Sequence, residues 1–446
     1  MTMMHTPATD LPPARTRNRW LIAGMGAMLQ LCLGTVYAYT IFQDPFVKSY
    51  QWTNTQVSGA FSTAICFLGL AAAWGGINLK RFGPRKLAMT GGALFGIGYL
   101  VAALALQSHS LMLFYFGYGV IGGVGLGLGY VTPVATAAKW FPDRKGLVTG
   151  MVVMGFGFGA LLMSKVLAPT LIAWTGGNYV HVFGAMGVLF LVATIFVAFF
   201  LVNPPAGWAP KGYSPAAAAS AAAQDADGSL TARSCLLSGR FVMMWLVFFC
   251  NIAAGIAIIN FQSPLMQELW KNSNTVAAAA TLMSIGATLT AVSSLFNGAG
   301  RFLWGGASDK IGRVQAFRIM LGTQIVAFAG MIWMTQTGSP WVFGALVCYV
   351  LLCYGGGFGT MPSFVTDVFG PRMMSVVYGV ILTAWAAAGV AGPQIFAKVK
   401  DLYPPAQYGN TAAIYSFIVA GGFLLAGLVM SLFLNNKRFT AQTSNG

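Results

Sequence analysis

The sequence is poor in charged residues and poorest in acids. Only 8% of its 446 residues are Asp, Glu, Lys or Arg, whereas a water-soluble domain carries about 25%. Hydrophobic residues make up 57% of the chain, and its mean hydropathy is +0.70. This composition excludes a water-soluble enzyme and indicates a protein that lies within a lipid bilayer.

Features of metal sites and catalytic sites are also missing. The six cysteines include no CxxC pair, so neither a metal site nor a disulfide framework is expected. A GYGVIG sequence at 117–122 matches a dinucleotide-binding pattern, but it lies inside an apolar stretch instead of following a strand. No nucleophile with a neighbouring base is evident, so we expect no enzyme, no cofactor and no bound metal.

Acidic side chains and histidines are absent from the middle of the apolar segments. All nine Asp and Glu lie in tails, loops or segment ends, and the three histidines are His5, His109 and His181. Proton-coupled carriers use buried acids or histidines as relays, so the sequence favours anion exchange over proton symport. Glu268, at the outer end of an apolar segment, is the one candidate relay, although a carboxylate exposed at a helix end is the simpler interpretation.

Apolar stretches long enough to cross a membrane occur twelve times. Each membrane-spanning helix needs about 20 mainly apolar residues. The predicted spans are 20–41, 54–75, 86–107, 111–138, 146–168, 180–202, 241–264, 277–304, 315–335, 341–364, 375–397 and 411–434.

The basic residues report the orientation of these spans. With a cytoplasmic N-terminus, 19 Lys and Arg fall on the inner side and five on the outer side, while Arg301 lies within a span. The positive-inside rule then predicts that both termini are cytoplasmic, in the plasma (inner) membrane of the cell. The net charge of +16 is distributed over short loops, so no nucleic-acid partner is expected.

A repeat divides the chain into two halves. Gly76 and Gly83 recur as Gly305 and Gly312 at an offset of 229, and a second motif repeats at an offset of 228. Two six-helix bundles in parallel orientation around a central cavity are predicted. The expected organisation is a tail at 1–19, a bundle at 20–202, a mostly disordered linker at 203–239, a bundle at 240–434, and a tail at 435–446, in a monomer.

Three segments carry a resemblance to a known family. The loop GGASDKIGR at 305–313 resembles the signature loop of the major facilitator superfamily. LFNGAGRFLWGGASDKIGR, AKWFPDRKG and GGGFGTMPSFVTDVFGPR resemble, more narrowly, the oxalate/formate antiporter family. The resemblance implies the twelve-helix major facilitator fold and the carriage of small carboxylates by alternating access. Lys80 departs from the superfamily pattern, which usually has an acid at that position.

The loops on the inner side of the two halves are expected to form gates that close the cavity. The gating residues are predicted to be Gly76, Gly83, Arg85, Arg144, Lys145, Gly305, Asp309, Gly312 and Arg313. Asp309 is expected to pair with Arg144, Lys145 or Arg313 and so to hold the inner side closed.

Arg301 is the first candidate substrate-binding residue. It stands eight residues before Asp309, which places it roughly 12 Å deeper in the membrane along a continuous helix. Charged residues at such depth usually face a cavity and mark a substrate pathway, and a guanidinium binds a carboxylate through two parallel hydrogen bonds. The alternative is an arginine that extends to the inner surface. The resemblance implies that Arg301 binds the substrate carboxylate.

Aromatic residues are expected to line the cavity around Arg301. The family resemblance, which covers nearly the whole chain, implies that Tyr37, Tyr130, Phe156, Tyr354 and Phe358 face the substrate, although aromatic side chains of a membrane protein also face lipid. Family members that exchange oxalate have a second cation where this chain has Trp385. One buried cation leaves a dianion with an uncompensated charge, which is costly, so a monocarboxylate such as formate, lactate or pyruvate is the expected substrate, and oxalate is the less favoured alternative.

Two other functions are compatible with the sequence. The first is a proton-coupled monocarboxylate symporter, which Glu268 would permit. The second is a membrane receptor that senses the anion without moving it, with 203–239 as its output segment.

Overall fold

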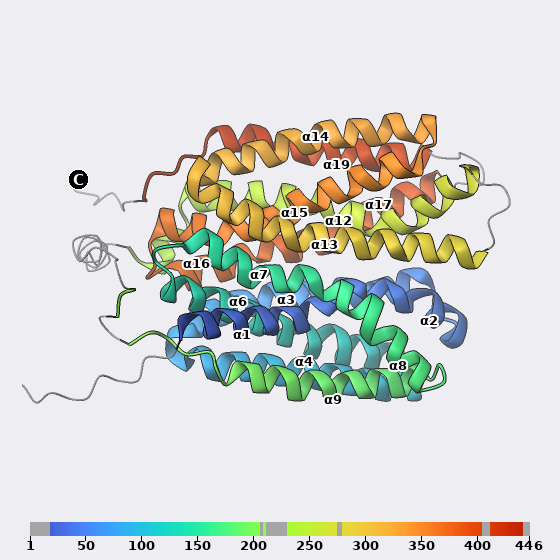
Figure 1. Cartoon of the computed structure of the whole chain (residues 1–446), viewed down its shortest axis with the longest axis horizontal. Coiled ribbons are helices and arrows are strands. Elements are labelled where there is room, and N and C mark those ends of the chain that lie inside the picture. Colours follow the sequence, from blue (N-terminus) through green and yellow to red (C-terminus); the bar gives the residue numbers. More distant parts are fainter. Residues whose placement is uncertain (1–17, 206–207, 211–229, 274–278, 404–410, 440–446) are drawn as a thin grey trace, which may run out of the picture.

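The computed structural model describes residues 18–205, 208–210, 230–273, 279–403 and 411–439. All regular elements in these ranges are helices, and no strand occurs there. The long helices run side by side and form an elongated bundle (Figure 1). The predicted all-helical class is confirmed.

The first half contains the helices before the linker. They are α1 (Arg19–Gly34) continued by the 3-10 helix η1 (Thr35–Phe42), α2 (Gln43–Tyr50), α3 (Asn54–Phe82), α4 (Pro84–Gln107), α5 (Leu111–Phe114) with the π-helical η2 (Tyr115–Ile121) and α6 (Gly122–Trp140), α7 (Lys145–Leu162) with η3 (Met163–Leu167) and α8 (Ala168–Trp174), and α9 (Tyr179–Ala198).

The second half contains the long helices that follow the linker. The short helix α11 (Ala232–Leu236) precedes this half within the linker, and the helices of the half itself are α12 (Gly239–Ser273), α13 (Ala279–Ile311), α14 (Arg313–Thr337), α15 (Pro340–Phe369), α16 (Met374–Ile381) with α17 (Thr383–Leu402), and α19 (Thr411–Leu432). Of the predicted disordered linker, 206–207 and 211–229 lie outside the described residues, and α11 forms within its remainder.

Eleven helices of the described ranges are long and apolar enough to cross a membrane. They correspond to eleven of the twelve predicted spans. The twelfth, predicted at 277–304, forms α13 from Ala279 onward, whereas 277–278 lie outside the described residues. This helix is long enough to span a bilayer, but it carries Asn297 and Arg301 in its apolar stretch.

Several helices extend further than their apolar sequences. The prediction ended one span at residue 75 and another at 304, whereas α3 continues to Phe82 and α13 to Ile311. Each helix then stops at a glycine with positive φ, Gly83 at 76° and Gly312 at 88°, a conformation that favours glycine. The two turns are 229 residues apart, as the repeat predicts.

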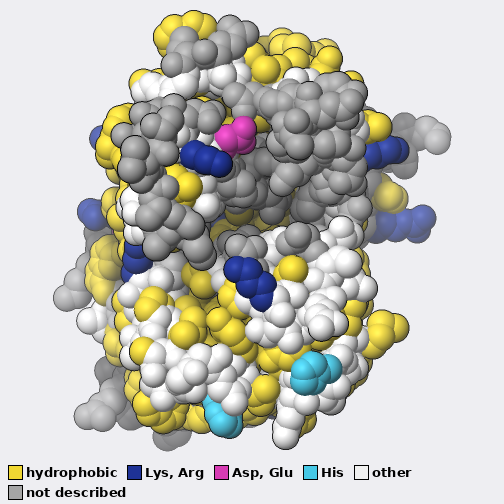
Figure 2. Space-filling view, turned by 90° about the vertical axis from the view of Figure 1, so that its right-hand side faces the viewer, with side chains coloured by type: hydrophobic (Ala, Val, Ile, Leu, Met, Phe, Trp, Pro, Cys, Tyr) yellow, Lys and Arg dark blue, Asp and Glu magenta, His cyan; other side chains and the backbone are white. Residues whose placement is uncertain are grey.

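Both described chain ends lie at one end of the bundle. We call this the proximal end: α1 begins there and α19 ends there (left in Figure 1). The opposite, distal end carries α2 and α8. Figure 2 looks onto the distal end, where Lys and Arg side chains are sparse over the described surface. This distribution agrees with the charge asymmetry of the predicted loops.

Helices α7 and α13 form the centre of the interface between the halves. They lie side by side in Figure 1 and pack along their length. The second part of the interface is formed by α3 of the first half against α16 and α17 of the second half. Residues that face inward from these helices are therefore enclosed between the two halves.

Candidate functional site

Arg301 lies on α13 at the interface and is completely buried. Its Nε donates to Oδ1 of Asn297 at 3.2 Å, one turn earlier on the same helix. Its Nη1 donates across the interface to the Tyr130 hydroxyl at 3.4 Å and to the Val153 carbonyl at 3.3 Å. The guanidinium therefore points toward the first half, and it does not extend to the proximal surface.

Two phenylalanines enclose the guanidinium, one from each half. The Arg301 Cζ atom lies 4.7 Å from the centroid of the Phe358 ring on α15. On the other side it lies 5.2 Å from the centroid of the Phe156 ring on α7. An aromatic face attracts a cation, and the attraction is strongest when water is excluded. The groups that contact the Arg301 guanidinium are thus all neutral.

Six aromatic side chains surround Arg301, three from each half. Trp385 is central, since its ring centroid lies 4.8 Å from Phe358, 5.3 Å from Tyr130 and 5.4 Å from Phe156. Tyr37 packs edge-on against Phe156 at 5.1 Å. We call the whole group the Arg301 site; it consists of Tyr37, Tyr130, Phe156, Arg301, Tyr354, Phe358 and Trp385.

The Arg301 site is closed to solvent in this conformation. Six of its seven side chains have 0% exposure, and Tyr37 has 6%. The hydroxyls of Tyr37 and Tyr354 are hydrogen-bonded at 2.6 Å and link the two halves directly. Every residue that the sequence predicts for substrate binding is therefore found in one enclosed cluster.

Polar groups of the site retain unused hydrogen-bonding capacity. Arg301 Nη2 and Trp385 Nε1 are buried, and neither has a hydrogen-bond partner among the described residues. The nearby Tyr378 hydroxyl on α16 is in the same condition. Because a buried donor without a partner is destabilising, these three groups together suit a ligand that brings acceptor oxygens.

Asn297 and Tyr378 lie beside Arg301 but were not predicted from the sequence. Asn297 precedes Arg301 by four residues, and this spacing places two side chains on one helix face. That signal was available in the sequence. Tyr378 lies on the short helix α16, which breaks before α17 at Leu382. No spacing rule places it beside α6, so its position depends on how the halves dock.

Asp309 connects the halves at the proximal end through backbone groups. Its Oδ1 accepts from Gly146 N at 3.3 Å and its Oδ2 accepts from Leu147 N at 3.1 Å. Both amides belong to the first turn of α7, whose dipole also attracts a carboxylate. Of the three predicted side-chain partners of Asp309, Arg313 is the one found, at 2.6 Å.

A second acid extends this network. Arg313 Nε donates to Asp367 Oδ2 at 2.9 Å, and Lys145 Nζ lies 3.9 Å from Asp367 Oδ1. Arg144 lines the same proximal cavity of about 490 Å³, but no ion pair involves it among the described residues.

The predicted gating residues of the first half behave differently from those of the second. Gly76 on α3 packs against the backbone of Ser375 and Gly379 in the second half. Arg85 instead stacks on Phe199 of its own half, with Cζ 4.6 Å from the ring centroid. Among the described residues, the hydrogen bonds of Asp309 with the first turn of α7 thus have no carboxylate counterpart in the first half.

Glycines allow the helix backbones of the two halves to touch. A Cβ added at Gly157 on α7 would collide with the Gly298 backbone on α13, and one at Gly150 would collide with the Arg301 carbonyl. Small residues permit this approach between membrane helices. The closed interface therefore depends on these positions.

We expect Gly157→Val to destabilise the closed conformation and to reduce the transport rate about tenfold or more. Overpacking costs about 1–3 kcal/mol, and this amount is applied to the closed conformation alone. The measurement is the initial rate of labelled-substrate movement into vesicles. Gly24→Val is the matched control, because no atom lies within 4 Å of a Cβ added at Gly24. An unchanged rate in the Gly157 variant would show that closure does not require this contact.

Known proteins are similar to this chain in sequence and in fold. The sequence profile of the Major Facilitator Superfamily matches residues 21–393. The oxalate:formate antiporter of Oxalobacter formigenes is 27% identical, covering 96% of this chain and 95% of that protein. Apicoplast pyruvate carrier 1 of Toxoplasma gondii is 28% identical, covering 89% and 88%. A solved proton:xylose symporter superimposes with a TM-score of 0.71 at 17% identity, covering 94% and 97%.

Proposed function

The chain belongs to the Major Facilitator Superfamily, and from this premise we propose that it carries small monocarboxylates across a membrane by exchange. It is a multi-pass membrane transporter and not an enzyme. The observation that supports the substrate class is the single guanidinium of the Arg301 site, enclosed by neutral aromatic walls.

The charge of the site favours a monoanion. Arg301 is the only charged residue among the seven side chains of the Arg301 site. One carboxylate neutralises it through charge-assisted hydrogen bonds, whereas a dianion would bring a second charge into a region without water. Trp385 supports this choice, because its Nε1 offers a hydrogen bond without a charge.

The aromatic walls favour a small substrate. The rings around Arg301 pack closely against each other, with 4.8–5.4 Å between the centroids of Trp385 and its three neighbours, so a large substrate would have to separate them widely. Aromatic surfaces replace the water shell of a partly apolar anion, and a few polar groups orient it. Formate, lactate and pyruvate fit this description, and the names of the two sequence relatives include oxalate, formate and pyruvate.

The two halves supply an alternating-access mechanism. In the closed structure, Asp309 on α13 holds the first turn of α7, and Arg301 contacts groups of both halves. Breaking the proximal contacts and rocking the halves would expose the Arg301 site to the proximal side, as in other transporters built from repeats. The gating residues act by stabilising one of the two end states.

We further propose that the proximal end is cytoplasmic, in the inner membrane. The predicted inner loops hold 19 Lys and Arg against five in the outer loops, and this asymmetry orients membrane proteins.

The substrate class is tested by thermal unfolding of the purified protein with a panel of carboxylates. A ligand at 100 times its Kd adds about 2.7 kcal/mol to the free energy of unfolding when it binds only the folded state. We expect formate, lactate or pyruvate to raise the Tm and oxalate to have a smaller effect. Trp385→Lys should reverse this order, since it supplies a second charge.

The same panel contains the outcomes that would contradict the proposal. If no monocarboxylate raised the Tm while sugars did, the substrate class would be wrong. If oxalate stabilised the parent and the Trp385→Lys variant equally, charge would not set the selectivity. Trp333→Lys is the matched control, because Trp333 on α14 is 61% exposed and lies outside the Arg301 site.

A further inference from the structure

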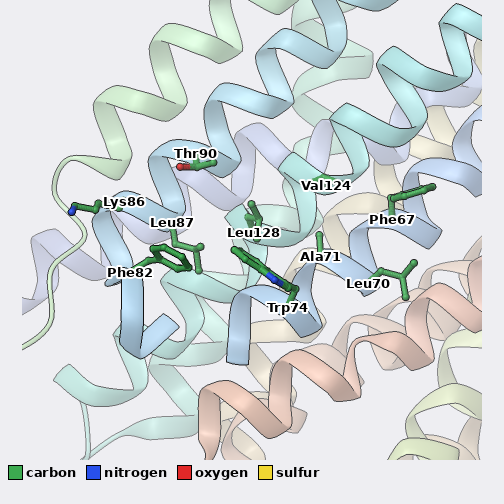
Figure 3. A pocket seen from close by; sticks show the side chains of 10 residues that line it. All are labelled: Phe67, Leu70, Ala71, Trp74, Phe82, Lys86, Leu87, Thr90, Val124 and Leu128. Carbon is green, nitrogen blue, oxygen red and sulfur yellow. The ribbon is translucent and has the colours of Figure 1, made fainter. Parts of the chain in front are cut away.

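An apolar groove lies on the outer surface of the first half, apart from the Arg301 site. Helices α3, α4 and α6 form it, and its volume is about 530 Å³, within the range of small-molecule sites. Figure 3 shows Phe67, Leu70 and Trp74 along one wall, with Leu128 between the helices. Leu70 and Trp74 are about half exposed, so the groove opens toward the lipid.

The groove is about as long as one leaflet of a bilayer. Its lining on α3 extends from Phe67 to Phe82, and 15 steps of about 1.5 Å give roughly 22 Å along the helix. A bilayer with its polar headgroup regions is about 40–45 Å thick, so one leaflet is about 20–22 Å thick. Phe82 is the last residue of α3, so one end of the groove reaches the proximal end of the bundle.

Two basic side chains lie at the proximal end of the groove. Lys86 lines the groove and points away from it in Figure 3. Arg81 precedes Phe82 at the end of α3, with Cζ 5.4 Å from the Phe82 ring centroid. Both side chains are exposed, and neither is part of an ion pair among the described residues. Their charge is available to an external anion.

Trp74 and Phe82 provide a stacked aromatic wall below these cations. Their ring centroids are 5.7 Å apart, with 27° between the planes. Both rings are exposed on the outer surface, 49% and 38% respectively. The order from the proximal end inward is thus cation, aromatic wall and aliphatic wall, which matches the order of phosphate, interface and acyl chain in a phospholipid.

We propose that this groove is a binding site for an anionic phospholipid. One acyl chain lies against Leu70, Trp74 and Leu128, and the phosphate lies between Lys86 and Arg81. Basic pockets between membrane helices bind acidic headgroups, and the groove supplies the apolar part that a free phosphate cannot use. The site is distinct from the proposed substrate site, so either proposal can fail alone.

The experiment is native mass spectrometry of the purified protein with dioleoyl phosphatidylglycerol or dioleoyl phosphatidylcholine. The parent should retain the anionic lipid preferentially. Arg81→Gln with Lys86→Gln should weaken phosphatidylglycerol binding about 30-fold, and either change alone about 5-fold. Arg233→Gln with Lys437→Gln is the matched control, because both cations are exposed in the linker and the C-terminal tail, do not line the groove, and should alter binding less than twofold when removed.

Two further results decide whether phosphatidylglycerol binding depends on the groove or on the headgroup alone. Trp74→Ala leaves every charge in place and should weaken phosphatidylglycerol binding, whereas binding through the headgroup alone would be unaffected and would overturn the groove assignment. Equal retention of the two lipids by the parent, or equal losses in the two double variants, would overturn the proposal. Thermal unfolding of each variant confirms that it remains folded.

Discussion

Arg301→Ala is expected to weaken monocarboxylate binding at least about 100-fold, because each hydrogen bond to a charged group contributes about 1.5–3 kcal/mol. Arg301 is completely buried, and its Nη2 has no partner among the described residues. A carboxylate placed there would accept from a fixed, planar donor. Loss of the side chain removes both the charge and the hydrogen bonds.

Arg301→Lys separates these two contributions. Lysine retains the charge but lacks the planar pair of donors, so binding should be weakened about tenfold and not abolished. The lysine would also lose the contacts of Nε with Asn297 and of Nη1 with Tyr130. Affinities are measured by titration calorimetry with formate, lactate and pyruvate.

Arg233→Ala is the control for the Arg301 variants. Arg233 is exposed on α11, outside the Arg301 site, and its loss should leave affinity unchanged. Near-normal affinity in Arg301→Ala, with folding intact, would remove Arg301 from the binding site.

Much of the fold could be predicted because membrane helices have a simple sequence signature. Eleven predicted spans coincide with helices that are long and apolar enough to cross a membrane. The repeat at an offset of 229 corresponds to the equivalent turns at Gly83 and Gly312. Helix ends were less predictable, since α3 and α13 continue beyond the apolar stretch until a glycine permits the turn.

The membership of the Arg301 site was predictable, but its contacts were not. Arg301 is a rare charge within an apolar span, the family resemblance indicates the six aromatics, and all seven side chains lie together. The partners of Asp309 in the other half could not be predicted in this way, since they are the backbone amides of Gly146 and Leu147. Backbone donors have no residue-type signature, so only the docking of α7 against α13 identifies them.

Exchange without a proton gradient is the second expected result, and it follows from the neutral surroundings of Arg301. The groups that contact its guanidinium are an amide, a phenol, a backbone carbonyl and two aromatic rings. None carries a negative charge. When the halves close without substrate, the cation is removed from water without a counter-charge, which is unfavourable by several kcal/mol.

A bound monocarboxylate removes most of this penalty. It neutralises Arg301 before the halves close, so the loaded carrier passes the closed state faster than the empty carrier. A difference of about 3 kcal/mol in this barrier corresponds to roughly a 100-fold difference in rate. The empty carrier would then return slowly, and net transport would require substrate on both sides of the membrane.

Glu268 offers the competing mechanism. It lies near the distal end of α12, five residues before the helix ends at Ser273. A proton carried by this side chain could compensate the charge of the anion and permit net uptake. Under that mechanism, a proton gradient would drive uptake and Glu268→Gln would abolish it.

The decisive measurement is uptake of labelled monocarboxylate into proteoliposomes with equal pH on both sides, comparing vesicles preloaded with unlabelled substrate against empty vesicles. We predict rapid uptake into the preloaded vesicles and at least about 100-fold slower uptake into the empty ones. Rapid uptake into empty vesicles, driven by an inward proton gradient and abolished by Glu268→Gln, would contradict exchange through Arg301.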